Sequence, residues 1–301
     1  MTRSQWVLVW MLLILSPVSA TANVFSQFSL NLGSESNVPR GLDADHEVES
    51  QFIQLGFNGG KFFQLGLNDS LTLSSNITIN HYNSTSGFDS YSLGAQAEYG
   101  HKFGFGAYAP RLGVSIGLNR NFMQGRVRDS LGKTVQLSLS KRFTPAFMLR
   151  AGIDYEDNES PTVQADEATL SFGYDPELRL PFELFSYHSK AAFIDGEYAF
   201  ANGLLLEGRF RRIDGGTVSS TTQPSLALYK KARAFFSDPG FDSDWFAYLL
   251  DARTSEWSAG LSIPMDIDSS INLRATWHDS KSSANGSYEN AIFTVGYVRN
   301  F

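Results

Sequence analysis

Apolar and polar residues alternate in short stretches along most of the chain. Leu112, Val114, Ile116 and Leu118 are apolar, for example, and the residues between them are glycine and serine. Because successive side chains of a strand point to opposite faces, such a stretch predicts a β-strand with one apolar and one polar face. Thirteen stretches show this pattern: residues 28–33, 53–67, 71–79, 93–99, 112–118, 135–139, 149–155, 168–174, 192–200, 204–210, 257–263, 271–277 and 293–301.

These strands are typical of a transmembrane β-barrel, in which an apolar outer face contacts lipid and a polar inner face lines the lumen. Aromatic residues repeatedly end the apolar faces, among them Tyr99, Tyr155, Trp257 and Trp277, as expected where rings lie at a membrane interface. After Leu15 no apolar run is long enough for a transmembrane helix. The pattern therefore predicts an all-β fold, a transmembrane antiparallel up-and-down barrel.

The expected number of strands is 14 or 12, because single-chain bacterial barrels have an even number and place both termini in the periplasm. The stretch that decides between them is Leu178–Tyr187. If it forms an upward strand after a turn at 175–177, the barrel has 14 strands. If 167–189 is entirely external loop, the barrel has 12. We favour 14 strands.

Connections of two lengths alternate along the chain. Asn68–Ser70 and Ala201–Gly203 are short, whereas Ser34–Glu47 and Asp214–Phe246 are long. Short turns are typical of the periplasmic side of such barrels and long loops of the outside. Within the longest loop, Leu226–Phe236 has apolar residues three and four apart beside a basic strip, and we expect it to form a helix that caps the rim.

The beginning of the chain reads as a secretory signal peptide. Arg3 supplies the positive charge, Trp6–Leu15 is an unbroken apolar run, and small residues precede possible cleavage sites after Ala20 and Ala22. The apolar run is about half as long as a membrane anchor needs to be. We expect residues 1–20 to be removed, with cleavage at 22 as the alternative, and residues 21–301 to form a single barrel domain.

The chain ends in an alternating segment whose last residue is phenylalanine. This segment resembles the C-terminal signal of Gram-negative outer-membrane β-barrel proteins, and the residues that carry the resemblance are Phe293, Val295, Tyr297 and Phe301. The resemblance implies recognition by the barrel assembly machinery and a final location in the bacterial outer membrane, in contact with its lipid and lipopolysaccharide. It implies a location rather than an activity, because this class includes porins, enzymes, adhesins and assembly factors.

Composition narrows the chemistry further. The chain has no cysteine, which excludes a lipid-modified N-terminal cysteine, disulfides and thiolate chemistry. Without Arg3 the mature chain would carry 23 basic and 31 acidic residues, a net charge of −8, which argues against nucleic acid as a partner. The sequence indicates no cofactor, and it leaves the oligomeric state open.

The predicted inner face is polar and balanced in charge. Eight basic and eight acidic residues fall on inner positions: Lys102, Arg111, Arg142, Arg150, Arg179, Arg209, Arg211 and Arg274 against Glu98, Asp154, Glu156, Glu183, Asp195, Glu197, Glu207 and Glu256. Balanced charge argues against strong ion selectivity, which requires a surplus of one sign. Opposite charges would either pair across a narrow lumen and close it, or segregate on facing walls and leave a path for water.

Two weaker candidates for chemistry lie in predicted loops. The His-Asp-Ser segment that begins at His278 contains residue types that a hydrolase would use as base and nucleophile. Asp238, Asp242 and Asp244 offer oxygen atoms suited to calcium, but their spacing fits no standard calcium loop. We expect both groups to be solvated loop residues, and we assign no catalytic residue and no metal site.

The leading hypothesis is a porin-like channel for small hydrophilic solutes rather than an enzyme. It rests on the polar inner face and on the lack of an identifiable catalytic set. The alternative is a non-transporting surface barrel that binds a partner through its external loops, and the third possibility is an outer-membrane hydrolase.

Overall fold

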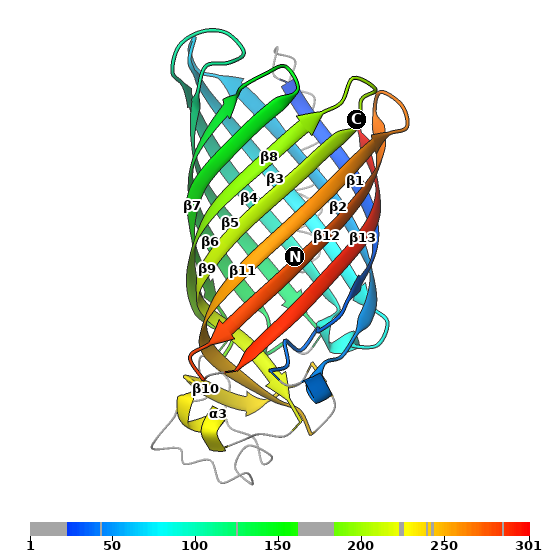
Figure 1. The fold of residues 1–301 in the computed structure, drawn as a ribbon, viewed down its shortest axis with the longest axis vertical. Helices are drawn as coiled ribbons and strands as arrows, with labels where there is room; N and C mark the ends of the chain where they lie inside the picture. The colour runs from blue at the N-terminus through cyan, green and yellow to red at the C-terminus, as the bar shows by residue number, and fades with distance from the viewer. Residues whose placement is uncertain are drawn as a thin grey trace, which may run out of the picture.

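The computed structural model of the chain describes residues 23–301 apart from 43, 125, 162–183, 223–225, 239, 242–243 and 285. The predicted signal peptide lies outside the described residues, and its removal stays a prediction. The described residues form a closed antiparallel β-barrel of tilted strands (Figure 1). In the described residues, no helix is long and apolar enough to cross a membrane.

Twelve strands form the wall of the barrel, and one further short strand, β10, pairs with β11 beyond it. The wall strands are β1 (Asn23–Glu35), β2 (Ser50–Gln64), β3 (Asp69–Tyr82), β4 (Ser90–Lys102), β5 (Arg111–Met123), β6 (Ser130–Arg142), β7 (Phe147–Glu159), β8 (Tyr187–Ala199), β9 (Leu205–Thr221), β11 (Phe246–Pro264), β12 (Ser269–Ser282) and β13 (Ser287–Asn300). The remaining elements are β10 (Ala234–Ser237), the helix α3 (Leu226–Lys231) and two 3₁₀ helices at Ala44–His46 and Ser86–Phe88.

The preference for 14 strands is wrong, and the alternative of 12 is confirmed. β7 pairs directly with β8, with Phe147 opposite Tyr198 at one end and Asn158 opposite Tyr187 at the other. This register leaves no place in the wall for the two additional strands expected within 168–187. Most of that stretch lies outside the described residues.

The last strand closes the barrel. β13 pairs with β12 on one side and with β1 on the other, where Tyr297 lies opposite Leu30. Because every wall strand has a neighbour on both sides, the wall has no unpaired edge. Closure of this kind satisfies backbone hydrogen-bonding groups within lipid, where water cannot do so.

The two ends of the barrel differ. Five short turns join β2 to β3, β4 to β5, β6 to β7, β8 to β9 and β11 to β12. They lie at the top in Figure 1 together with the end of β13, and we call this the short-turn end. The β1–β2 connection and the β9–β11 connection, which includes α3 and β10, are longer and lie at the opposite end with the shorter β3–β4, β5–β6 and β12–β13 connections. We call this the long-loop end. The start of β1 and the end of β13 therefore share the short-turn end.

The connection between β9 and β11 is shorter and more structured than the sequence predicts. β9 continues to Thr221, so the loop expected from Asp214 does not begin there. The helix expected over Leu226–Phe236 ends at Lys231 and is followed by β10. The reason is visible in the packing: Phe235 joins one buried apolar cluster and Phe236 joins another, and consecutive residues reach opposite sides only in an extended strand.

The outer face of the wall is apolar. Ile116, Leu137, Ile153, Ile194 and Trp257 all expose their side chains on it, and the polar partners in each alternation turn inward. A continuous apolar surface of this kind is unfavourable in water and suits the hydrocarbon of a membrane. The barrel is therefore built to span a lipid bilayer.

Candidate functional site

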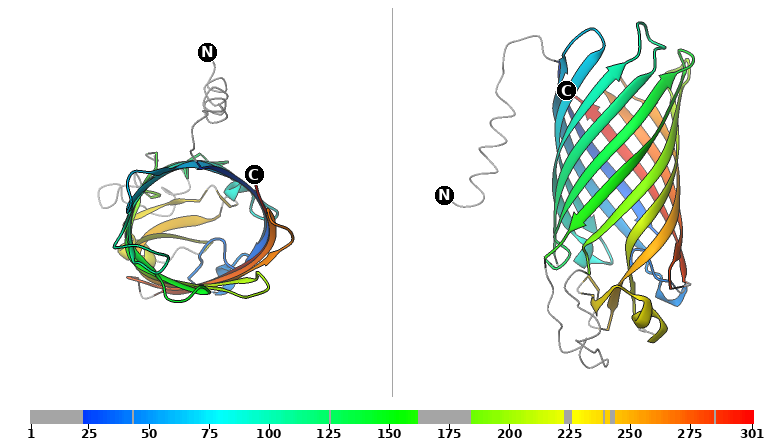
Figure 2. Two further views of the ribbon diagram at one scale, coloured as in Figure 1. Left: turned by 90° about the horizontal axis from the view of Figure 1, so that it is seen from above. Right: turned by 90° about the vertical axis from the view of Figure 1, so that its left-hand side faces the viewer.

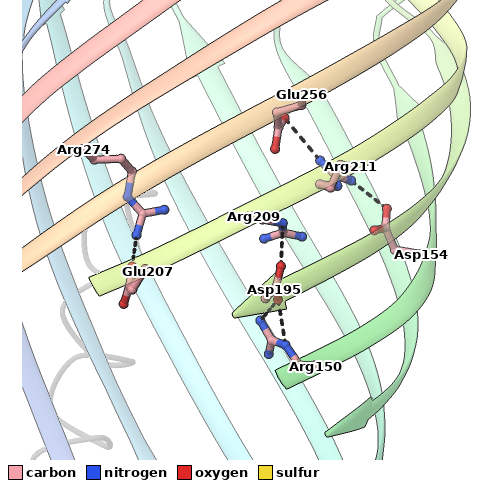
Figure 3. A network of polar contacts seen from close by, with 8 residues as sticks. All are labelled: Arg150, Asp154, Asp195, Glu207, Arg209, Arg211, Glu256 and Arg274. Atoms are coloured by element: carbon pink, nitrogen blue, oxygen red, sulfur yellow. Dashed lines mark hydrogen bonds and ion pairs between the residues drawn. The ribbon is translucent and has the colours of Figure 1, made fainter. Parts of the chain in front are cut away.

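Charged side chains on the inner face form ion pairs along the wall. Asp195 on β8 lies between two arginines: Oδ2 is 2.6 Å from Nη2 of Arg150 on β7, and Oδ1 is 3.2 Å from Nε of Arg209 on β9. Figure 3 shows the three side chains meeting between neighbouring strands. One carboxylate thus partly neutralises two guanidinium groups.

Arg211 forms a second bridge nearby. Its guanidinium lies 2.7 Å from Asp154 on β7 and 3.7 Å from Glu256 on β11 (Figure 3). Glu256 is also 3.3 Å from Nε2 of His278 on β12. The bridge therefore joins four strands of one part of the wall, β7, β9, β11 and β12.

Two further pairs follow the same arrangement. Arg274 Nη2 on β12 lies 2.7 Å from Glu207 on β9, and Arg111 Nη2 on β5 lies 3.1 Å from Glu98 on β4. In the strand order, all of these partners are at most two strands apart. Among the described residues, the predicted inner charges therefore pair around the wall and not across the lumen.

The other predicted inner charges have different surroundings. Four of them form no ion pair with a described residue: Lys102, Arg142, Glu156 and Glu197. Arg142 instead donates a hydrogen bond of 2.9 Å to the carbonyl of Pro145. Arg179 and Glu183 lie outside the described residues.

A different part of the wall carries neutral amides. Asn31 on β1 donates to Gln54 on β2 at 3.0 Å, Gln54 donates to Asn80 on β3 at 2.8 Å, and Asn80 donates to Ser90 on β4 at 3.1 Å. This chain of hydrogen bonds spans four neighbouring strands. The inner surface thus has an amide sector on β1–β4 and a charged sector on β7–β12.

Exposure differs among the inner charges. Arg274 keeps 54% of its side-chain surface accessible, although it points into the barrel, and Arg111 keeps 41%. Arg211 and Glu256 keep only 20% and 17%, and Asp195 keeps 13%. The exposed arginines show that part of the inner surface is accessible to water.

The connection between β1 and β2 is attached to the opposite part of the wall at the long-loop end. Ser220 donates a backbone hydrogen bond of 2.9 Å to the carbonyl of Pro39, and the Ser219 hydroxyl donates one of 2.6 Å to the carbonyl of Arg40. These bonds attach the connection to β9, four places away from β1 around the wall. Figure 2 shows the connection inside the outline of the ring when the barrel is viewed along its axis.

Arg40 has an unusual backbone and a cavity-lining side chain. Its φ of 54° lies in the left-handed region, which non-glycine residues rarely adopt and which costs on the order of 1–3 kcal/mol. The side chain is exposed, and it lines a cavity inside the barrel together with residues of the wall strands. Electrostatic interaction, first with Tyr288 and then with Tyr187 and Glu35, raises the pKa of Arg40 against the opposing effect of burial.

A cavity of about 220 Å³ lies beside Arg40. Arg40 comes from the first connection, whereas the other lining residues come from wall strands, including Glu156 on β7, Tyr187 on β8, Arg211 on β9 and Tyr288 on β13. The cavity therefore lies in the long-loop half of the lumen.

A buried ion pair holds the longer connections together over this end. The carboxylate of Asp238 is fully buried and lies 2.5 Å from Nη2 of Arg128, and the Ser220 hydroxyl donates to it as well. The Arg128 guanidinium also lies 4.6 Å from the ring centroids of Phe88 and Phe185. These contacts connect the β3–β4, β5–β6, β7–β8 and β9–β11 connections, and we call the assembly the loop cap.

Of the three metal candidates, the structure describes Asp238 and Asp244. Asp238 is engaged with Arg128 in the loop cap, and Asp242 lies outside the described residues. Within the part of the chain that the structure describes, no group of three or more His, Asp or Glu residues is placed to hold a metal ion.

The hydrolase candidates lie on the same face of β12 but have different partners. His278 faces Glu256, whereas Ser280 is fully buried and shares a hydrogen bond of 2.8 Å with Thr254. The two residues therefore do not form a base–nucleophile pair in this structure. Whether the protein has any enzymatic activity stays open to test.

The sequence pattern missed Phe193, which supports the charged sector. Its ring centroid lies 5.1 Å from the Arg209 guanidinium and 5.7 Å from that of Arg150. The ring covers Gly152, directly opposite on β7, where an added Cβ would lie 2.3 Å from the carbonyl oxygen of Leu137 and 2.7 Å from the ring. The sequence feature that could have indicated this role is an aromatic residue at an inner position, with a glycine at an inner position of the preceding strand.

The two arginines around Asp195 make a testable prediction about ion selectivity. Arg150→Gln alone should change stability by less than about 1 kcal/mol, because Arg150 is well exposed and Arg209 still neutralises Asp195. The double change Arg150→Gln with Arg209→Gln removes both cations and should shift permeation toward cations. Reversal potentials in a KCl gradient measure the shift. Equal selectivity of the double variant and the unchanged protein would contradict this assignment.

The residues of the predicted assembly signal lie on the strand that closes the barrel. Phe293, Val295 and Tyr297 expose their side chains on the outer face of β13, and Phe301 follows the strand. Their recognition by the assembly machinery stays a prediction.

No protein family matches the sequence, and no curated protein matches it either. Solved structures do match its fold. An outer membrane channel from Pseudomonas putida F1 superposes with a TM-score of 0.56 over 92% of this chain and 95% of its own, at 12% identity. The NanC porin (TM-score 0.46, 10% identity, 90% and 98% coverage) and an anion-selective porin from Comamonas acidovorans (TM-score 0.39, 9% identity, 93% and 99% coverage) are less similar.

The closed wall, the apolar outer face and the similarity to the Pseudomonas structure define the class. The chain is a porin-like β-barrel with the architecture of Gram-negative outer-membrane proteins. The compartment that this architecture identifies is the bacterial outer membrane.

Proposed function

We propose that the protein is a channel for small hydrophilic solutes. The observation that carries the proposal is the arrangement of the inner charges, which, among the described residues, pair around the wall and form no ion pair across the lumen between the charged and the amide sectors. Charges that crossed the lumen would obstruct it, whereas charges paired along the wall line it.

The orientation that fits this function places the short-turn end in the periplasm and the long-loop end outside. The termini share the short-turn end, as they do in other bacterial barrels. Lipopolysaccharide would then surround the long-loop half of the wall. Solutes from outside would pass the loop cap and the cavity beside Arg40 before they reach the short-turn half of the lumen.

Balanced charge should make the channel weakly selective between cations and anions. Each arginine in the charged sector has a carboxylate partner, so neither sign is in large surplus. Selection would then depend more on size and on hydrogen bonding than on net charge.

Solute flux into liposomes tests the proposal. Refolded protein in liposomes should admit glucose but exclude a large dextran, and protein-free liposomes provide the control. Absence of glucose flux through protein that is folded by circular dichroism would overturn the channel proposal and favour the alternative of a barrel that only binds a partner through its loops.

A further inference from the structure

Two charged side chains that line the cavity beside Arg40 have neither an ion pair nor a side-chain hydrogen bond to a described residue. Arg211 is paired with Asp154 and Glu256, and Glu35 receives hydrogen bonds from Tyr82 at 3.2 Å and Asn290 at 2.8 Å. These contacts compensate the charges of most of the charged side chains that line the cavity. The side chains of Arg40 and Glu156 have no such close contact with a described residue, although Arg40 interacts electrostatically with Glu35, and Glu156 with Arg211 and Arg40, over a longer distance.

Unpaired charges in a confined space are costly unless water or a ligand solvates them. Arg40 and Glu156 line the same cavity and come from different elements, the first connection and β7. The cavity thus offers a positive and a negative group within one small volume.

The size of the cavity limits what could occupy it. Its volume of about 220 Å³ corresponds to roughly seven water molecules. A solute of that size with one carboxylate and one ammonium group would satisfy both unpaired charges at once. A neutral sugar would satisfy neither charge fully, and a solute with one charge would leave the opposite group unpaired.

We propose that this cavity is a binding site for small zwitterionic solutes of the α-amino acid type, with Arg40 as the partner of the carboxylate and Glu156 as the partner of the ammonium group. The strained backbone at Arg40 agrees with this role, because such strain is retained where a side chain must be held in one place. The inference rests on the proposed channel function and specifies a solute class for it.

The test measures concentration-dependent uptake into liposomes of L-alanine, propionate, alaninamide and glucose. These probes carry both charges, the carboxylate alone, the ammonium alone and neither charge. Alanine uptake should saturate, whereas uptake of the other three should rise in proportion to concentration. Arg40→Gln and Glu156→Gln should each raise the half-saturation concentration for alanine at least about tenfold, because each loses a hydrogen bond to a charged group.

Two further variants serve as controls. Arg40→Gly removes the charge and accepts a φ of 54° without strain, so it should behave as Arg40→Gln does if the charge is what matters. Arg111→Gln removes an arginine outside the cavity, which is paired with Glu98, and should leave alanine saturation unchanged.

The outcomes separate the inference from the channel proposal. Glucose uptake without saturable alanine uptake overturns the zwitterion site and leaves the channel intact. Saturable alanine uptake that Arg40→Gln and Glu156→Gln leave unchanged also overturns the site, as does equal saturation by all four probes. Uptake of none of the probes overturns both proposals.

Discussion

Replacing Asp238 with alanine is expected to release the loop cap and raise the conductance of the channel. The carboxylate of Asp238 is fully buried and is the ion-pair partner of Arg128, which is itself largely buried. Removing one member of a buried pair leaves the other charge uncompensated and costs about 3–5 kcal/mol. The population of barrels with an undocked cap should therefore rise on the order of 100-fold or more.

Limited proteolysis of the cap and bilayer conductance measure this change together. The β9–β11 connection should be cleaved faster in Asp238→Ala, while the wall stays resistant. Asp214→Ala is the matched control, because Asp214 pairs with Arg253 at 3.3 Å but both side chains are more than half exposed, and such surface pairs contribute little. A cap as resistant in Asp238→Ala as in the control would show that the buried pair does not hold it.

Arginine at position 137 is expected to destabilise the barrel, whereas arginine at position 138 should be tolerated. Leu137 exposes its side chain on the outer face of β6, and the next residue, Ser138, turns inward. A basic residue on the lipid face costs about 2–4 kcal/mol near the middle of the membrane, and one on the lumen face is hydrated. The two variants differ by one position and carry the same new side chain.

Urea unfolding of both variants in lipid vesicles tests the assignment of the two faces. Leu137→Arg should lower the free energy of unfolding by the stated amount, and Ser138→Arg should remain close to the unchanged protein. Similar losses of unfolding free energy in both variants would mean that the side chain of Leu137 does not face lipid.

Local alternation predicted the wall strands because it is a property of each segment. It also led to the error in strand number: residues 168–174 alternate as clearly as any strand, yet β7 pairs with β8 without them. Membership in the wall depends on which strands become neighbours, and alternation contains no information about neighbours.

The same limit applies to the site. The alternation of apolar and polar residues placed Arg150, Asp195 and Arg209 on the inner face. Their ion pairs, however, depend on strand order and register. Arg40 follows no periodic pattern because it lies in a connection, and its place in the lumen comes from hydrogen bonds to β9. Asp238 was expected to be solvated, whereas the surrounding connections bury it.

Single-channel recording in planar lipid bilayers is the most direct test of the central claim that the barrel encloses a water-filled path. Insertion of the refolded protein in KCl should produce discrete conductance steps with weak discrimination between potassium and chloride. Inserted, folded protein that produces no conductance steps, for the natural chain and for Asp238→Ala alike, would contradict the account.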